Sequence, residues 1–263
     1  MTRIREIIDA IEELAPLSLQ ESYDNAGVQV CGTAGAAGNE SGLDAECTGV
    51  LVCLDITEDV IAEAVSKACN LVVSHHPLIF SPLRKVAGDS LPERCVMAAI
   101  RGGVTLYSAH TNLDNAPCGV NFKIAQKLGL ENLEGIGTGL VGELPEALDE
   151  AAFLEELAGT FDVACIQHSS FLDKPVKKVA LCGGSGAFLI ADARAAGADC
   201  FVTGEISYHH YFEADDILLV ALGHYQSEQY TKDLLRDHLS ERFEGLAVEM
   251  TSINTNPVSY FVK

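Results

Sequence analysis

The sequence is short of positive charge. Its 263 residues include 17 lysine and arginine residues against 38 aspartate and glutamate residues, which gives a formal net charge of -21 at pH 7. A chain with this balance has no broad electrostatic attraction for nucleic acid or for an anionic membrane surface. Both are therefore disfavoured as partners. A small-molecule substrate that carries phosphates would need a local cation, which bound metal ions could supply.

Long apolar runs and paired cysteines are also missing. No run reaches the roughly 18 residues of a membrane span, and the first residues, MTRIREIIDAIEELAP, mix acids with apolar residues, unlike a signal peptide. The nine cysteines are odd in number and form no CxxC pair, which favours reduced, structural thiols. These observations predict a cytoplasmic protein. Its length suits one large domain or two closely joined lobes.

Several familiar catalytic signatures are absent. The sequence has no nucleophile elbow, no HExxH motif and no kinase signature. The glycine-rich segment at residues 183–186 lacks the lysine of a P-loop and the spacing of GxGxxG. It could present backbone amides to an anion, or it could be a tight turn between a strand and a helix. The chemistry must therefore come from the histidines and acids.

What is present is an alternation of strand-like and helix-like segments. Val50 to Asp55 predicts a buried strand, Thr57 is a candidate N-cap for the following helix, and Leu71 to Val73 predicts the next strand. This order is typical of a crossover in a parallel sheet. The second half repeats the alternation, with strands predicted near residues 140–144, 163–167, 179–182, 200–202 and 217–222. The fold class predicted is α/β, in two similar halves.

Histidine and carboxylate side chains follow these strands at the points where the strands end. His75 and His76 stand between one strand and Pro77, which cannot continue a central ladder. On its own this pair fits a metal site or a solvated surface loop about equally well. Other candidates in the same position are His110, Asp114, Glu205, His224 and Glu228. Because open α/β sheets carry their sites at the carboxyl ends of the strands, these side chains can converge.

The candidate residues predict a metal site. Imidazole and carboxylate ligands together suit Zn, Mn, Fe or Ni. His224 and Glu228 are four residues apart near the start of a predicted helix, so both can point the same way. The candidates outnumber the ligands of one tetrahedral ion. They indicate two divalent metal ions with a bridging carboxylate or hydroxide, which is a recurring hydrolytic arrangement.

Six segments together resemble a known family. The segments YDNAGVQV, SHHPLIF, SAHTNLDNAPCGVN, CGGSGAFL, ADCFVTGE and GHYQSEQY occur in the order and approximate spacing of the Nif3-like proteins, also called GTP cyclohydrolase 1 type 2 homologs. The resemblance covers nearly the whole chain. It implies a Nif3-like α/β fold of two related lobes with mixed sheets, residues 1–130 and residues 131–263, with the metal site between the lobes. It also implies a homohexamer without an inserted third domain.

The same resemblance implies roles for individual residues. The ligands of the two divalent ions would be His75, His76, Asp114, His224 and Glu228, with Glu228 as the bridge between the ions. Supporting or substrate-facing roles would fall to His110, Glu205 and Asn25, although the residues around Asn25 could equally form only a turn. Tyr23 stands where the family often has tryptophan. The catalytic residues stay unknown.

The family name implies a hydrolase. A metal-bridging hydroxide would attack GTP or another nucleotide-like substrate, with zinc, iron, manganese or nickel as the metal. The alternative is a non-catalytic hexameric metal carrier, sensor or interaction protein. Arg84 and Lys85 are the nearest candidates for contacting a triphosphate, and they could equally be ordinary solvated surface residues.

Overall fold

The computed structural model describes residues 1–33 and 41–261 and divides into two compact units. The first unit comprises residues 1–116 and 231–255, and the second comprises residues 117–230 and the residues from 256 onward. Both units are α/β with mixed sheets, as the sequence predicts. The predicted boundary at residue 130 differs from this division, because the helix after residue 119 packs on the second sheet and the last helix packs on the first.

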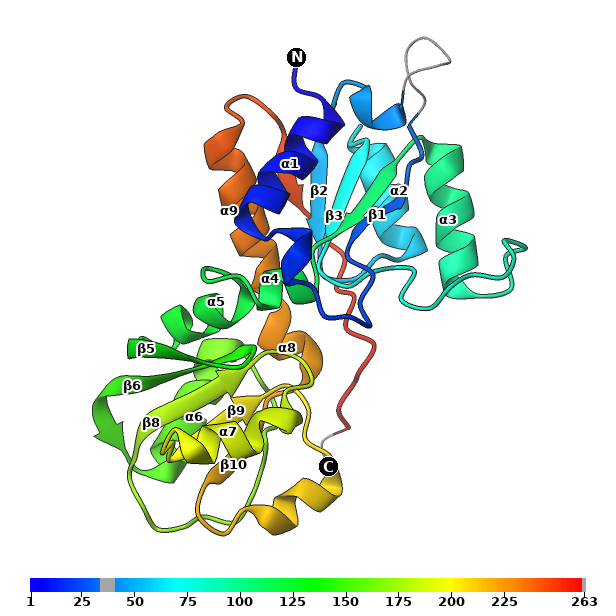
Figure 1. Ribbon diagram of the computed structural model, residues 1–263. Helices are drawn as coiled ribbons and strands as arrows, with labels where there is room; N and C mark the ends of the chain where they lie inside the picture. The colour runs from blue at the N-terminus through cyan, green and yellow to red at the C-terminus, as the bar shows by residue number, and fades with distance from the viewer. Residues whose placement is uncertain (34–40, 262–263) are drawn as a thin grey trace. The chain divides into compact units, whose positions relative to one another are not determined.

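The first unit is built on a five-stranded sheet of order β1-β4-β3-β2-β11 (Figure 1). The strands are β1 (Gly27–Val30), β2 (Val50–Cys53), β3 (Leu71–Ser74), β4 (Thr105–Ser108) and β11 (Val248–Met250). Strands β11, β2, β3 and β4 run parallel, whereas β1 pairs antiparallel with β4. The predicted parallel crossover is confirmed. Helix α2 (Glu58–Ser66) connects β2 to β3, and the Thr57 side chain accepts a hydrogen bond from the Val60 amide at its start.

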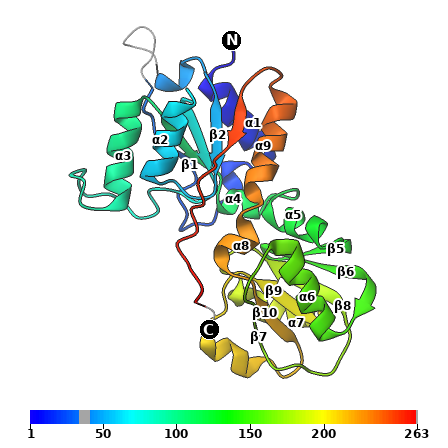
Figure 2. The ribbon, with the colours of Figure 1, turned by 180° about the vertical axis from the view of Figure 1, so that it is seen from behind.

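Helices cover both faces of this sheet. Helices α1 (Ile4–Leu14) and α9 (Thr231–Arg242) lie on one face, and α2 and α3 (Leu91–Gly102) lie on the other (Figure 1, and from behind in Figure 2). Alternate strand side chains therefore enter different cores. Leu51 packs in the core with α2 and α3, whereas the Tyr107 hydroxyl donates to Glu12 of α1 at 3.2 Å. Shorter elements are η1 (Leu17–Leu19), η2 (Gly42–Asp44) and α4 (Thr111–Asp114).

The second unit carries a six-stranded sheet of order β5-β6-β8-β9-β10-β7. The strands are β5 (Glu131–Ile136), β6 (Gly139–Leu148), β7 (Gln167–His168), β8 (Val176–Cys182), β9 (Cys200–Thr203) and β10 (Leu218–Ala221). Only β8, β9 and β10 pair in parallel. The helical elements are α5 (Val120–Lys127), α6 (Glu150–Phe161), η3 (Ala187–Leu189), α7 (Ile190–Ala195), η4 (Tyr208–Glu213) and α8 (His224–Glu228). Helices α6 and α7 lie on opposite faces of this sheet (Figures 1 and 2).

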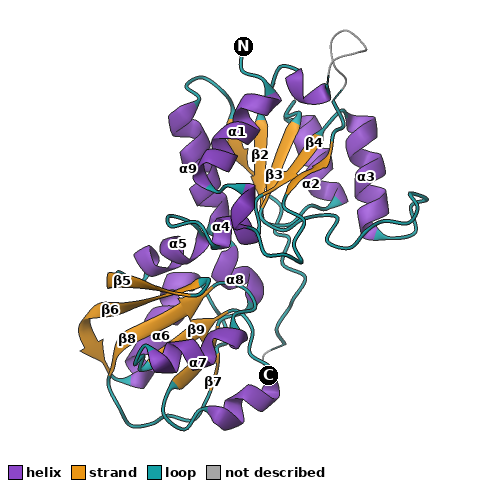
Figure 3. Ribbon diagram, viewed as in Figure 1, coloured by secondary structure: helices purple, strands orange, loops and turns teal. Residues whose placement is uncertain are grey.

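Two predicted elements are wrong in extent (Figure 3). The strand predicted near residues 163–167 is reduced to β7, because only Gln167 and His168 pair with β10. The helix predicted to run on from His224 is divided into α8 and α9. Tyr230, between them, packs on Phe161 of the second unit at a ring distance of 5.8 Å, whereas the apolar side chains of α9 serve the first unit.

Residues 32–47 are rich in glycine, alanine and polar residues, which predicts a loop; this segment lies partly outside the described residues, and its described part includes η2. Among the residues that the structure describes, no helix is both long enough and apolar enough to cross a membrane.

Candidate metal centre

In the first sheet, the parallel register places the carboxyl ends of strands β2, β3 and β4 side by side. Cys53 of β2 is paired with Ser74 of β3, and Ser74 is paired with Ser108 of β4. Residues that follow these three positions therefore leave the sheet at the same edge. They are Asp55, His75, His76 and His110.

The turn that carries the two adjacent histidines is fastened by hydroxyl groups. The Ser74 hydroxyl donates to the His76 carbonyl at 2.8 Å and lies 2.7 Å from the Ser108 hydroxyl. The His76 amide donates to the Leu54 carbonyl at 3.0 Å. Strand β3 has already ended at Ser74, so the alternation of a strand no longer sends the two neighbouring side chains to opposite faces. The turn allows both imidazoles to serve one site.

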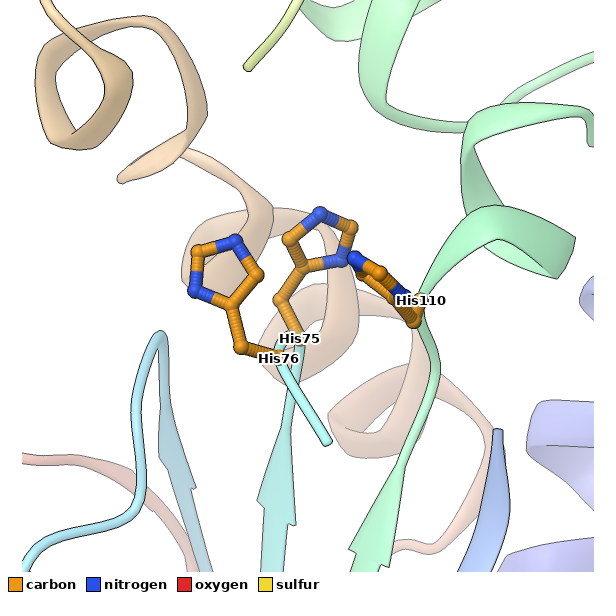
Figure 4. A group of neighbouring side chains, drawn as sticks. All are labelled: His75, His76 and His110. Atoms are coloured by element: carbon orange, nitrogen blue, oxygen red, sulfur yellow. The ribbon is translucent and has the colours of Figure 1, made fainter. Parts of the chain in front are cut away.

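His75, His76 and His110 form what we call the three-histidine cluster (Figure 4). One ring nitrogen of each residue lies within 4.8 Å of those of the other two. The His75 side chain is fully buried, and those of His76 and His110 are about one-fifth exposed, at 22% and 18%. The structure thus places His110, expected in a supporting role, beside two of the predicted ligands.

Each imidazole of the cluster is anchored through Nδ1 to an oxygen atom. The pairs, with their nitrogen-to-oxygen distances, are His75 with the Ala109 carbonyl (2.8 Å), His76 with Asp55 (2.7 Å) and His110 with Asp24 (2.7 Å). Carbonyl and carboxylate oxygens only accept hydrogen bonds, so Nδ1 is the donor in each pair, and Nε2 is the nitrogen that a neutral ring offers to a metal ion. Metal-binding histidines in proteins are commonly held in this way.

Asp24 is the more deeply embedded of the two carboxylate anchors. Besides His110, it accepts hydrogen bonds from the Thr111 amide at 3.0 Å and from the Thr111 hydroxyl, and its side chain is fully buried. Burial disfavours the charged carboxylate, but the hydrogen bonds from His110 and Thr111 outweigh it and hold the pKa of Asp24 well below its usual range. The anchor of His110 is therefore a carboxylate near neutral pH.

Asp114 reaches the cluster through a short helix. The amides of Leu113 and Asp114 donate to the His110 carbonyl at 2.8 and 3.0 Å, which closes α4. Asp114 Oδ1 then lies 3.7 Å from His75 Nε2. A segment whose conformation is ambiguous in the sequence is thus a helical turn that directs a carboxylate toward a histidine.

Asp55 is a residue of this site that sequence reasoning missed. Its Oδ1 is the anchor of His76, and its Oδ2 accepts a hydrogen bond from the Thr255 hydroxyl at 2.7 Å. The signal that could have found it is its position just after β2, at the same sheet edge as the histidines. Asp24 stands next to Asn25, in the segment whose residues could equally form only a turn.

The second unit carries three further candidate residues, which we call the His224 set. His224 Nε2 lies 3.0 Å from Glu228 Oε2, and His224 Nδ1 lies 3.2 Å from Glu205 Oε1. Helix α8 supplies both His224 and Glu228, four residues apart on one side. The Glu228 side chain is only 5% exposed, whereas that of Glu205 is 57% exposed.

The glycine-rich turn supports the His224 set. Gly184 has φ +61°, and a Cβ atom there would lie 2.3 Å from Glu228 Oε1. Its amide donates to the Ser227 hydroxyl at 3.0 Å, and that hydroxyl donates to the His224 carbonyl at 2.8 Å. Of the two interpretations of residues 183–186, the structure therefore favours a tight turn that packs against α8.

The donor atoms of both groups are chemically suited to a divalent metal. The three-histidine cluster offers imidazole nitrogens, and Asp114 and Glu228 offer carboxylate oxygens. Such nitrogen and oxygen donors suit first-row divalent ions. These side chains could hold a metal ion. Asn25, expected to support the site or face the substrate, uses its side-chain amide to donate a hydrogen bond to the Ile79 carbonyl at 2.7 Å.

Known proteins resemble this chain over nearly its whole length. The family model described as Duf34/NIF3 (NGG1p interacting factor 3) matches residues 2–257. A GTP cyclohydrolase 1 type 2 homolog of Lactococcus lactis is 31% identical over 264 residues, which cover 97% of this chain and 98% of the relative. The GTP cyclohydrolase 1 type 2 of Helicobacter pylori is 30% identical over 234 residues, covering 87% and 88%. A solved Bacillus cereus protein related to NIF3 has the same fold, with a TM-score of 0.90 over 99% of each chain at 22% identity.

Proposed function

Because this chain belongs to the Duf34/NIF3 family, we propose that its histidine and carboxylate side chains bind two divalent metal ions and that it is a metal-dependent hydrolase. The ligands in this proposal are His75, His76, Asp114, His224 and Glu228. The observation that carries the proposal is the shared anchoring of the three clustered imidazoles through Nδ1.

A histidine elsewhere in the chain shows why this anchoring is informative. His238 on α9 uses Nε2 to contact the Ala10 carbonyl at 3.0 Å, which ties two helices together. In the cluster, by contrast, all three rings contact oxygen atoms of the protein through Nδ1. Several rings that are each oriented through Nδ1 and whose ring nitrogens lie within 4.8 Å of one another are what a metal site requires.

The proposed chemistry follows from these donors. Divalent ions bound there would lower the pKa of a water molecule toward neutrality and polarise the substrate bond. Asp55 and Asp24 would hold His76 and His110 in the required tautomer and raise their basicity. Glu205, whose side chain is more than half exposed, would face the substrate.

The substrate we propose is GTP or another nucleotide-like compound. The names of the two relatives support this choice. Hydrolysis of GTP would add water at C8 of guanine and open its imidazole ring. Lys85 forms an ion pair with Asp89, so its charge is locally offset, and Arg84 lies on the exposed surface. We expect the metal ions to supply most of the positive charge that a triphosphate needs.

The test is elemental analysis of the purified protein together with GTP turnover in the same preparation. About two ions per chain, with turnover that a chelator abolishes and added metal restores, would support the hydrolase. Two ions without GTP turnover would favour the carrier or sensor, or another substrate. Protein without metal, prepared and reloaded under reducing conditions, would contradict the ligand assignment.

The assembly we propose is a homohexamer, and its support is the family resemblance. Native mass spectrometry of the full chain measures it directly. A monomeric mass at micromolar concentration would contradict it.

A further inference from the structure

Two exposed aromatic side chains stand beside the three-histidine cluster. Phe80 packs edge-to-face against His110, with ring centroids 6.2 Å apart and planes at 86°. Tyr23 packs against Phe80 at 6.5 Å and 63°. The exposed fractions are 64% for Tyr23 and 51% for Phe80. The two rings are adjacent, largely exposed and next to a polar cluster, so core packing does not explain their position.

A ring of hydrogen bonds holds the two aromatic residues in place. The Asn25 side-chain amide donates to the Ile79 carbonyl at 2.7 Å, and the Ile79 amide donates to the Gln29 side chain at 3.1 Å. The Gln29 side-chain amide in turn donates to the Asn25 carbonyl at 2.6 Å. These bonds join the turn that follows Tyr23 to the loop that precedes Phe80. The backbone segments that carry the two rings are therefore held together by hydrogen bonds.

The same backbone is connected to the cluster. Asp24, the neighbour of Tyr23, is the carboxylate that anchors His110. Phe80 touches the ring of His110 directly. A compound that approached the cluster on this side would meet aromatic faces whose position is tied to that of a cluster imidazole.

We propose that Tyr23 and Phe80 bind the flat heteroaromatic ring of the substrate by stacking. The inference rests on the proposed function and narrows it, since it assigns the substrate to compounds in which the bond under attack lies in or beside a planar ring. Stacking of a base on an aromatic side chain is typically worth about tenfold or more in affinity. It needs no cation, which suits a chain with a net charge of -21.

The test compares the binding of GTP and of tripolyphosphate, which lacks the ring, to the metal-loaded full chain by isothermal titration calorimetry. We expect GTP to bind at least about tenfold more tightly. Tyr23→Leu and Phe80→Leu should each weaken GTP binding about tenfold and leave tripolyphosphate binding and metal content unchanged. Tyr23→Phe and Phe80→Tyr should keep GTP binding because they keep the ring.

The control is Phe212→Leu, which removes a ring of the second unit that is 68% exposed, and it should change neither affinity. Three results would overturn the inference: GTP bound no more tightly than tripolyphosphate, leucine variants with unchanged GTP affinity, or leucine variants that dissociate the oligomer in native mass spectra. The last would make the pair a subunit contact. Failure of the proposed function would show instead as protein without metal or as turnover that a chelator does not affect. The three results above concern ring binding only, so the two failures can be told apart.

Discussion

The two units supply donor groups of different kinds and hold them by different means. The first unit presents three imidazoles, each oriented by a hydrogen bond from Nδ1 to an oxygen atom. The second presents one imidazole, His224, with a carboxylate beside each of its ring nitrogens. In the second unit the buried carboxylate of Glu228 is held in position by close packing against a glycine turn.

This difference determines how each group can fail. A hydrogen-bonded anchor can be removed singly while the backbone stays in place, so we expect graded losses in the three-histidine cluster. A carboxylate that packs against a backbone turn cannot be altered in such small steps, because any side chain added to the turn must displace the carboxylate. Substitutions around the three-histidine cluster should lower metal affinity alone. Substitutions around the His224 set should lower both metal affinity and the stability of the fold.

The largest expected effect is on metal binding by His75→Ala. His75 is the fully buried member of the cluster and lies 3.7 Å from Asp114. Its loss should weaken metal binding by more than about 100-fold, beyond the range found for residues that merely support a ligand. Elemental analysis after dialysis measures this. His238→Gln, which alters a histidine bound to the Ala10 carbonyl, is the control and should keep its metal.

Gly184→Ala should combine instability with metal loss. The substitution places Cβ 2.3 Å from Glu228 Oε1 and also strains a residue at φ +61°. We expect the free energy of unfolding to fall by about 3 kcal/mol. Gly197→Ala is the matched control, because Gly197 has φ +72° but open space around its Cβ position. It should cost about 1 kcal/mol and leave metal binding unchanged. Equal effects in thermal or urea unfolding would refute the packing argument.

Asp55→Asn should give an intermediate loss of metal affinity. The variant removes the charge that fixes His76 Nδ1 while keeping the size of the side chain. We expect metal to bind about 10-fold to 100-fold more weakly, with the fold retained. A competitive chelator titration measures the change. Asp216→Asn, which removes the charge of an acid paired with Arg194 at 2.8 Å, should bind metal normally.

The smallest effect expected here is on stability alone, through Glu63 of α2. This carboxylate accepts hydrogen bonds from the Thr251 hydroxyl and from the Ser252 amide at 2.9 Å. Burial disfavours its charge, but the bonds from Thr251 and Ser252 lower its pKa from 4.5 to about 2. Its contribution is therefore fully present above about pH 4.5 and is lost as the pH falls toward 2.

Glu63→Gln should lower the free energy of unfolding by about 2 kcal/mol at pH 7. The difference from the unsubstituted chain should shrink below pH 4.5, and metal content at pH 7 should not change. Urea unfolding at a series of pH values measures both trends. A difference that stayed constant down to pH 2 would show that the charge of Glu63 does not contribute.

Much of the local structure follows from the sequence by itself. Thr57 caps α2, and the strands before His75 and before His110 lie where apolar runs predict them. These features are local, because a cap or a buried strand depends on residues within a few positions. The sequence also predicts that His75 and His76 stand at the end of a parallel strand, and that the spacing of His224 and Glu228 places them on one side of a helix.

The tertiary structure decided what joins those segments. Asp24 is 86 residues from His110 and Asp55 is 21 residues from His76, so their role as anchors appears only when the sheet brings them together. The assignment of α5 and α9 to their units depended on which sheet each helix packs against. A single sequence records the chemistry of each side chain and its near neighbours, whereas hydrogen bonds between distant segments depend on sheet register and packing, which form only as the chain folds.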